Sequence, residues 1–241
     1  MPNFIGISSN TVDRAHLLTT SYRNFNTPYG SYFVSKPNRK SFVEQRINQP
    51  NKFVERRKEI ADKALEALAK KGYAKTSLRD IAAQADISLG SLSYYFEDKS
   101  ALIQYCTRRY KRKFISDLLD LTTKPLSTKE FVDQFIDIFV HAITEDQDVH
   151  RLWYDSKIQS LFDETFQKTV GGIEEELSNM VTVVIHHLES LSGKKSPTSP
   201  QQAYWLLDGM FQHFLMAGMF GEKHIDKKLQ KELKLFFSAV T

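Results

Sequence analysis

The sequence predicts an all-α protein, and three observations support this. Beyond residue 50, apolar residues recur at spacings of three and four, the period of one helix face. Several of these runs follow a Ser or Asp placed as a helix N-cap. The 241 residues include only 10 glycines and 7 prolines, too few for a β-chain with many tight turns. We therefore expect a succession of helices.

The expected helices of residues 51–100 are short. The first is an apolar run from Val54 that ends at Gly72, a residue suited to the position just past a helix end. Ser77 and Asp80 have the spacing of a capping box at the start of the second. The third is expected over residues 89–95. The expected N-caps of the second, third and fourth helices are Ser77, Ser88 and Asp98.

The expected helices of residues 101–241 are longer. Pro125 ends one helix, and Ser127 with Glu130 caps the next. The pair Gly171-Gly172 is expected to kink or bound the long helix that follows. The segment 192–200, rich in Ser, Pro and Lys, is a loop. Further helices are expected at about residues 147–160, 173–191, 201–220 and 224–240.

Composition excludes several classes of protein. No apolar stretch reaches 18 residues and no signal-peptide core is found near residue 1, so we expect neither a membrane span nor secretion. The lone Cys106 cannot form an intramolecular disulfide, which fits the cytoplasm. The adjacent pair His186-His187 has the wrong spacing for a metal site. We expect no metal, no cofactor and no membrane partner.

The net charge of +4 is unevenly distributed along the chain. Residues 51–115 hold 15 Lys/Arg and 8 Asp/Glu, whereas residues 116–241 hold 12 and 19. A basic front followed by an acidic back indicates that the front meets a polyanion. Residues 1–50, with 6 Lys/Arg and 2 Asp/Glu, are an extension that reads as a disordered basic arm, a passenger without function, or a transit peptide.

Residues 60–102 have the spacing of a DNA-binding helix-turn-helix. The second and third short helices are joined by residues 85–88, and in such a pair the latter helix enters the major groove. Ala82 and Ala85 are small enough for a close helix crossing. Helix starts favour phosphates, and small hydroxyl side chains can meet base edges. The candidate DNA-binding residues are Arg56, Thr76, Ser77, Leu78, Ser88, Leu89, Gly90, Ser91, Ser93, Tyr94, Tyr95 and Lys99.

This stretch resembles the TetR family of transcriptional regulators. The matching residues are Ala64, Leu68, Gly72-Tyr73, Thr76-Ser77-Leu78, Ile81-Ala82, Ala85, Ile87-Ser88, Gly90, Leu92, Tyr95-Phe96, Lys99 and Leu102. The resemblance implies a DNA-binding domain over residues 51–100 and a helical ligand-binding and dimerisation domain over residues 101–241. Asp86 departs from the usual turn glycine. Ser93 replaces a common DNA-contacting tyrosine, so that contact passes to Tyr94 or Tyr95.

The region 152–162 looks loosely like the body of the betaine-regulator subgroup. Polar and aromatic residues on otherwise apolar helices are where ligand-orienting groups would sit, although surface exposure and interhelical hydrogen bonds explain them equally well. A quaternary ammonium caged by Trp153 and Trp205 is one hypothesis. The basic run of residues 108–113 is expected to be a solvated face. The ligand-binding candidates are Arg151, Trp153, Tyr154, Asp155, Gln159, Trp205, Asp208, Gln212 and His213.

The sequence therefore predicts a cytoplasmic DNA-binding regulator, chiefly a ligand-responsive repressor of a palindromic operator. Its partners would be double-stranded DNA, a small-molecule effector and a second copy bound through helices near 201–221 and 224–240. The alternative is a body that recruits a protein partner instead of sensing a ligand. No phosphate-binding glycine loop or nucleophile elbow supports an enzyme, and Cys106 has no evident His partner.

Overall fold

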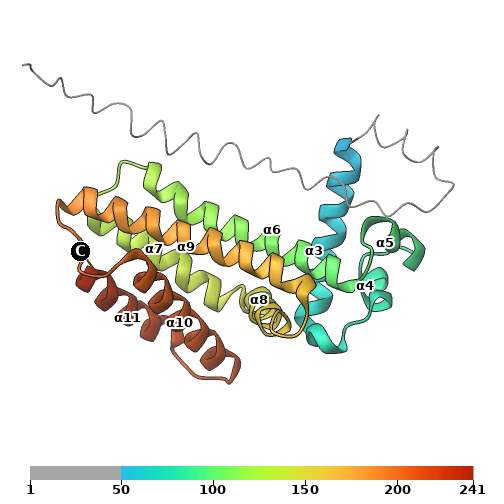
Figure 1. Ribbon diagram of the computed structural model, residues 1–241. Coiled ribbons are helices and arrows are strands. Elements are labelled where there is room, and N and C mark those ends of the chain that lie inside the picture. Colours follow the sequence, from blue (N-terminus) through green and yellow to red (C-terminus); the bar gives the residue numbers. More distant parts are fainter. Residues whose placement is uncertain (1–49, 241) are drawn as a thin grey trace, which may run out of the picture. The chain divides into compact units, whose positions relative to one another are not determined.

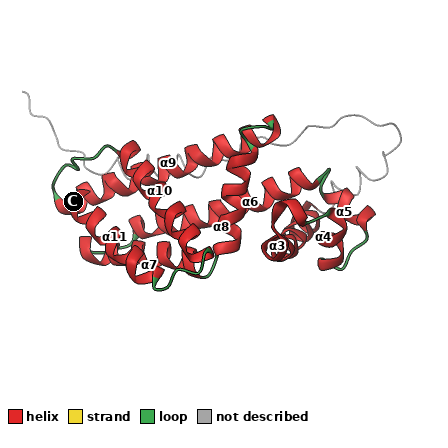
Figure 2. Cartoon of the chain, turned by 90° about the horizontal axis from the view of Figure 1, so that it is seen from below, coloured by secondary structure: helices red, strands yellow, loops and turns green. Residues whose placement is uncertain are grey.

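The computed structural model describes residues 50–240, and this part of the chain consists of helices and connecting loops without a strand (Figures 1 and 2). The predicted all-α fold is confirmed. The extension expected before residue 50 lies outside the described residues. The helices are α3 (Pro50–Lys75), α4 (Leu78–Gln84), α5 (Leu89–Tyr95), α6 (Lys99–Leu119), a 3-10 helix (Asp120–Thr123), α7 (Thr128–Thr144), α8 (Gln147–Gln159), α9 (Glu164–Ser192), α10 (Pro200–Met219) and α11 (Ile225–Val240).

Local capping signals fix where the helices begin. Ser77 forms a reciprocal capping box with Asp80, as predicted. The Ser88 hydroxyl accepts from the backbone N–H of Ser91 at the start of α5, and Asp98 caps α6. Each such cap is worth about 1 kcal/mol, because it satisfies a backbone donor that the helix leaves unpaired.

The prediction that Gly171-Gly172 kinks or bounds a helix is wrong. The two glycines lie inside α9, which begins at Glu164 behind an Asp163 cap and has no break. Its buried face continues across the pair, from Val170 to Ile173. Burying that face outweighs the cost of two helical glycines, about 1 kcal/mol each. At Gly72, by contrast, φ is 74° and α3 is kinked near the expected end.

Gly171→Ala is expected to raise the free energy of unfolding by about 0.5–1 kcal/mol. The position is exposed, and a Cβ there would meet no atom within 4 Å, so alanine only restricts the unfolded chain. Urea unfolding followed by circular dichroism measures the change. Gly193→Ala is the control: Gly193 caps α9 at φ 71°, so alanine there should destabilise. A stability loss in Gly171→Ala would contradict this account.

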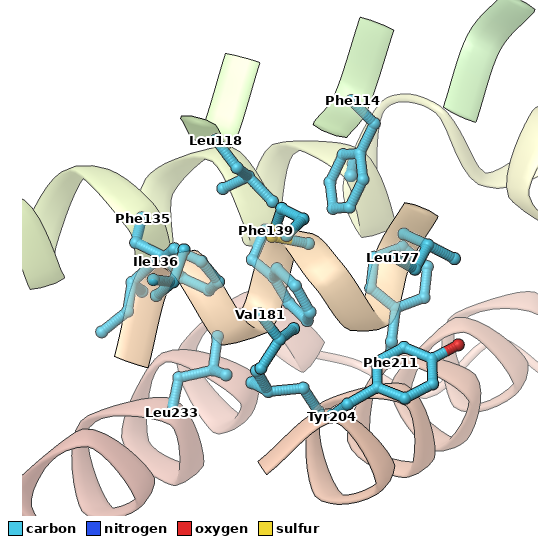
Figure 3. Close-up of a cluster of buried hydrophobic side chains, with 14 of the residues drawn as sticks. Phe114, Leu118, Phe135, Ile136, Phe139, Leu177, Val181, Tyr204, Phe211 and Leu233 are labelled. Atoms are coloured by element: carbon cyan, nitrogen blue, oxygen red, sulfur yellow. The ribbon is translucent and has the colours of Figure 1, made fainter. Parts of the chain in front are cut away.

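Two buried cores share helix α6. The first core joins α3, α4 and α5 to the beginning of α6 through residues such as Leu92 and Leu102. The second fills the body and receives Phe114 and Leu118 from the remainder of α6 (Figure 3). In Figure 3, side chains from α6, α7, α9, α10 and α11 meet around Phe139. One continuous helix therefore belongs to both halves.

The domain boundary expected at residue 100 stays a prediction. Residues 51–241 form one compact unit, which does not divide into the expected domains 51–100 and 101–241. Within residues 50–240, none of the helices is both long enough and apolar enough to cross a membrane.

Candidate nucleic-acid interface and buried charge network

The turn between α4 and α5 is built on Asp86. Its φ is 51°, in the left-handed region that an aspartate tolerates better than most residues. The backbone N–H of Asp86 donates to Ala83 (3.2 Å), and that of Ile87 donates to Ala82 (3.0 Å). Asp86 therefore supplies the geometry for which the family pattern uses glycine.

Helix α5 is anchored by one residue and exposed elsewhere. Leu92 is fully buried, and the following Phe96 is 2% exposed. Small or flexible side chains cover the outer face, so a nucleic-acid groove can approach the helix backbone closely. The exposed residues of this face are Ser88, Leu89, Gly90, Ser91, Ser93 and Tyr94.

An aromatic cluster separates the roles of the two tyrosines. The ring of Tyr95 stacks on Phe53 of α3 with centroids 5.1 Å apart, and it packs against the first core. Tyr94 meets the edges of both rings and remains exposed. Tyr94 is thus better placed than Tyr95 to reach a DNA phosphate.

The start of α4 presents fewer side chains than expected. Thr76 is buried, and its hydroxyl donates to the carbonyl of Gly72 (2.7 Å), which leaves only its backbone for a phosphate. Ser77 is engaged with the Asp80 carboxylate, whose pKa is lowered by hydrogen bonds from Lys71 and Ser77. Leu78 is half-buried against the first core. A phosphate contact at this helix start stays a prediction.

Basic residues in the first half of α3 make contacts within the chain. Arg56 bonds Glu59 (2.7 Å) on an exposed face. Arg57 turns inward, with its guanidinium 4.8 Å from the Phe96 ring centre and 4.4 Å from that of Tyr105. Its contact with Tyr105 therefore connects α3 to α6. Arg56 and Lys99 are the two cations of the candidate set, and their contact with DNA stays a prediction.

Lys99→Ala is expected to weaken binding to specific and random DNA alike. Lys99 is the first residue of α6, partly exposed, where burial lowers its pKa. Losing one phosphate contact should reduce the slope of log affinity against log salt concentration by about 1. Anisotropy titrations at several salt concentrations measure it. Lys129→Ala, on the exposed start of α7, is the control and should change nothing. A loss confined to one sequence would contradict the phosphate role.

The nine predicted ligand-binding residues do not meet in one site. Trp153 is fully buried, and its ring already faces the ammonium groups of Lys111 (5.2 Å) and Lys157 (5.6 Å). Trp205 is 62% exposed on α10. A cage formed by both tryptophans is therefore wrong, because one ring is covered by cations and the other lies on the surface.

The remaining candidates divide in the same way. Tyr154 and Asp208 bond each other (3.1 Å) inside the body, whereas Gln212 and His213 are exposed on α10. Arg151 reaches the carbonyl of Leu68 (3.5 Å), across to α3. The other two candidates, Asp155 and Gln159, are half-buried on α8.

An open groove of about 630 Å³ follows the outer sides of α10 and α11. Trp205, His213 and Lys231 are among its lining residues. Large apolar side chains are also exposed along these two helices, namely Trp205, Leu206, Met216, Met219 and Leu235, with Phe220 just after α10. An exposed apolar surface of this kind is typical of a protein–protein interface.

The expectation of a solvated basic run over residues 108–113 is wrong for Lys111. It is 3% exposed, while Arg112 and Lys113 are exposed and paired with acids. The periodicity contained this signal, since Lys111 lies four residues after buried Thr107 and three before buried Phe114. It is the charged member of an apolar stripe.

A chain of hydrogen bonds leads outward from Lys111. Its Nζ lies 3.2 Å from Nδ1 of the fully buried His150, and Nε2 of His150 lies 2.9 Å from the Tyr110 hydroxyl. Tyr110 donates to Asp146 (2.9 Å) at the start of α8. While Lys111 is charged, His150 must accept at Nδ1 and donate at Nε2. No feature of the sequence singled out His150, because an isolated histidine has no local signature.

A second network lies beside it. Lys157 of α8 bonds Glu174 of α9 (2.8 Å) and Asp208 of α10 (2.9 Å). Tyr154 and Tyr204 donate to these same carboxylates. Their charges are therefore shared among three donors.

The free energy of unfolding is expected to rise between pH 7 and pH 9 because of Lys111. Burial lowers its pKa from 10.5 to about 7, so the unfolded chain binds more protons in that range. The gain is up to about 2 kcal/mol. Urea unfolding of wild type and Lys111→Met at both pH values isolates it, because the variant lacks the group. Equal pH dependence in the two proteins would contradict it.

A small cluster connects the first core to the body. Leu68 of α3, Ile103 of α6, Leu152 of α8 and Phe166 of α9 are all buried together. Together with the hydrogen bond from Arg151 to the Leu68 carbonyl, this cluster brings α8 into direct contact with α3. A movement of α8 would therefore shift α3, which packs against α4 and α5 in the first core.

Known proteins match both halves of this arrangement. Residues 60–106 match the family described as bacterial regulatory proteins, tetR family. The HTH-type transcriptional regulator PksA of Bacillus subtilis is 23% identical over 162 residues, which are 67% of this chain and 79% of PksA. The resemblance of residues 152–162 to the betaine-regulator subgroup is not tested by these matches and stays a prediction.

Solved structures share the fold. A TetR transcription regulator from Haloarcula marismortui superposes with a TM-score of 0.66 at 17% identity, covering 78% of this chain and 98% of that one. The regulator FadR from Bacillus subtilis, solved in complex with stearoyl-CoA, gives a TM-score of 0.60 at 17% identity, with coverage of 76% and 98%.

Proposed function

We propose that this chain is a TetR-family, ligand-responsive repressor that binds a near-palindromic operator as a homodimer in the cytoplasm. The observation that carries this proposal is α5, a short helix held by one buried leucine with its small outer face exposed. Such a face admits the backbone to the major groove, where base edges are read.

The surface of α10 and α11 supports the dimer. Leu206, Met216 and Leu235 are all about half exposed there, and Leu206 lines the open groove. A two-fold interface uses the same patch on both copies. Two α5 helices would then face successive major grooves, about 34–36 Å apart or somewhat more, and the operator would share the two-fold symmetry.

The body supports a response to a small molecule. The buried charge of Lys111 and the half-buried pair Lys157–Asp208 are costly in a body that serves only as a scaffold. FadR, a structural relative, was solved with stearoyl-CoA. An effector that binds better to the state with displaced α5 helices would lower DNA affinity by its differential affinity and no more. Because α6 belongs to both cores, it is a direct route for this coupling.

The experiment is a competition between duplexes at 150 mM salt. DNA from upstream of the chain's own coding region should bind at least about a thousandfold tighter than random duplex of the same length. Equal affinities would contradict sequence-specific repression. A protein that instead occupied many dispersed sites and responded to no small molecule would favour the alternative, a body that recruits a protein partner.

A further inference from the structure

The interior of the body holds more hydrogen-bond donors than acceptors around Lys111. Its ammonium has three N–H donors and one polar partner, Nδ1 of His150. No carboxylate of residues 50–240 lies within 4 Å of it. The indole Nε1–H of Trp153, equally buried, has no acceptor among the described residues. The Lys111 ammonium is 5.2 Å from the centre of that indole ring, so the two donors are close neighbours in the interior.

Aromatic rings compensate the charge only in part. Lys111 lies 5.6 Å from the ring centre of Phe114 and 5.3 Å from that of Phe211, besides Trp153. Such contacts stabilise a cation, but less than a charge-assisted hydrogen bond to an anion does. Burial lowers the pKa of Lys111 to about 7, so the charged form is stabilised less here than in water.

The nearby charged groups do not supply a direct counter-charge to Lys111. Asp208 of α10 and Glu174 of α9 both bond Lys157 and a tyrosine, and on Lys111 they act only at longer range. Lys157 of α8 opposes the charge on Lys111, as does any protonation of His150. An oxyanion beside Lys111 would supply the direct counter-charge that these groups do not.

We propose that the effector is an organic anion, whose carboxylate or similar oxyanion accepts hydrogen bonds from Lys111 Nζ and Trp153 Nε1. This inference rests on the proposed function, since it names the chemical class of the effector. Phe114 and Phe211 require the rest of the molecule to be apolar. A quaternary ammonium is disfavoured, because it would place a second cation beside the ammonium of Lys111.

Binding there acts on the helices that hold the DNA-binding module. Lys111 is on α6, twelve residues after its first residue, and Trp153 is on α8 next to Leu152 of the cluster with Leu68. An anion that draws these two side chains together changes the approach of α8 to α6. Both helices continue into contacts with α3, so the change reaches the support of α4 and α5.

The test compares ligands that differ only in charge. Two sets are titrated calorimetrically into the full chain: decanoate with methyl decanoate and decyltrimethylammonium, and 2-naphthoate with its methyl ester and 2-naphthyltrimethylammonium. At least one carboxylate should bind about tenfold to a hundredfold tighter than its ester and its ammonium counterpart. Binding should also take up protons at pH 7.5, which titrations in two buffers of different ionisation enthalpy detect.

Lys111→Met should abolish both the preference for the carboxylate and the proton uptake. This variant removes a buried charge and keeps the length of the side chain, so it should melt no lower than wild type by circular dichroism. Lys113→Met, an exposed position two residues on, is the matched control and should keep both properties. Trp153→Phe, which deletes only the unpaired N–H and leaves an aromatic ring, should weaken carboxylate binding.

Three results would overturn the proposal: no binding of either carboxylate up to millimolar concentration, binding no tighter than that of the esters, or unchanged binding in Lys111→Met. DNA affinity is measured separately on the same preparations without any ligand. Carboxylate binding by a protein that ignores DNA would refute the proposed function and leave only an anion-binding site at Lys111. Normal DNA binding without carboxylate binding would refute this inference and leave the proposed function standing.

Discussion

Gly90→Glu is expected to lower the affinity for operator DNA by about a hundredfold or more without unfolding the protein. Gly90 is exposed on α5, and a Cβ there would meet only the Ser88 hydroxyl at 3.8 Å, so the fold accepts a side chain. In the groove, the same side chain blocks the approach of the helix backbone and places a carboxylate among phosphates. Losing even two base contacts costs about 2–6 kcal/mol. Fluorescence anisotropy with labelled operator measures the loss.

Gly171→Glu is the matched control. It makes the same substitution at an exposed glycine of α9, where nothing lies within 4 Å of a Cβ, and it should bind DNA as wild type does. The melting temperatures of both variants should stay near that of wild type. If Gly90→Glu bound the operator normally, α5 would not be the helix that enters the groove.

Leu206→Glu is expected to convert a dimer into a monomer. Leu206 is 54% exposed on α10 and lines the groove beside α11. Two-fold symmetry would bury two glutamates at one interface, and each uncompensated buried charge costs several kcal/mol. Light scattering should give a mass near 27.8 kDa instead of twice that value. Operator affinity should fall as well, because one half-site then binds alone.

Leu89→Glu controls for the chemistry of this substitution. Leu89 is 40% exposed on α5, so the change should leave the mass at two chains while it impairs DNA binding. The two variants thus separate assembly from recognition. A dimer that survives Leu206→Glu would show that the second copy is held elsewhere.

The helix starts could be predicted because their signals are local. Ser77, Ser88, Asp98 and Ser127 cap their helices within three residues of the chain, and the structure has all four where the pattern places them. The turn at Asp86 follows from the same kind of short-range geometry. The candidate reading face of α5 depends on little more than these caps and one buried leucine.

The interior of the body could not be predicted in the same way. Whether Lys111 faces solvent or the core depends on how α6 packs against α8 and α10, which no short pattern encodes. Trp153 and Trp205 look alike in sequence, yet one is fully buried and the other 62% exposed. At Gly171 the packing of a long apolar face overrode a local helix breaker. Tertiary contacts, not propensity, decide such positions.

Selection from a library of random duplexes tests the central claim most directly. The full chain is mixed with duplexes of about 30 base pairs at 150 mM salt, and the bound fraction is sequenced after several rounds. We predict one enriched near-palindrome whose half-site centres lie about one helical turn or somewhat more apart, and its loss with Gly90→Glu. No enriched motif, or the same motif with Gly90→Glu, would contradict a regulator that reads DNA through paired α5 helices.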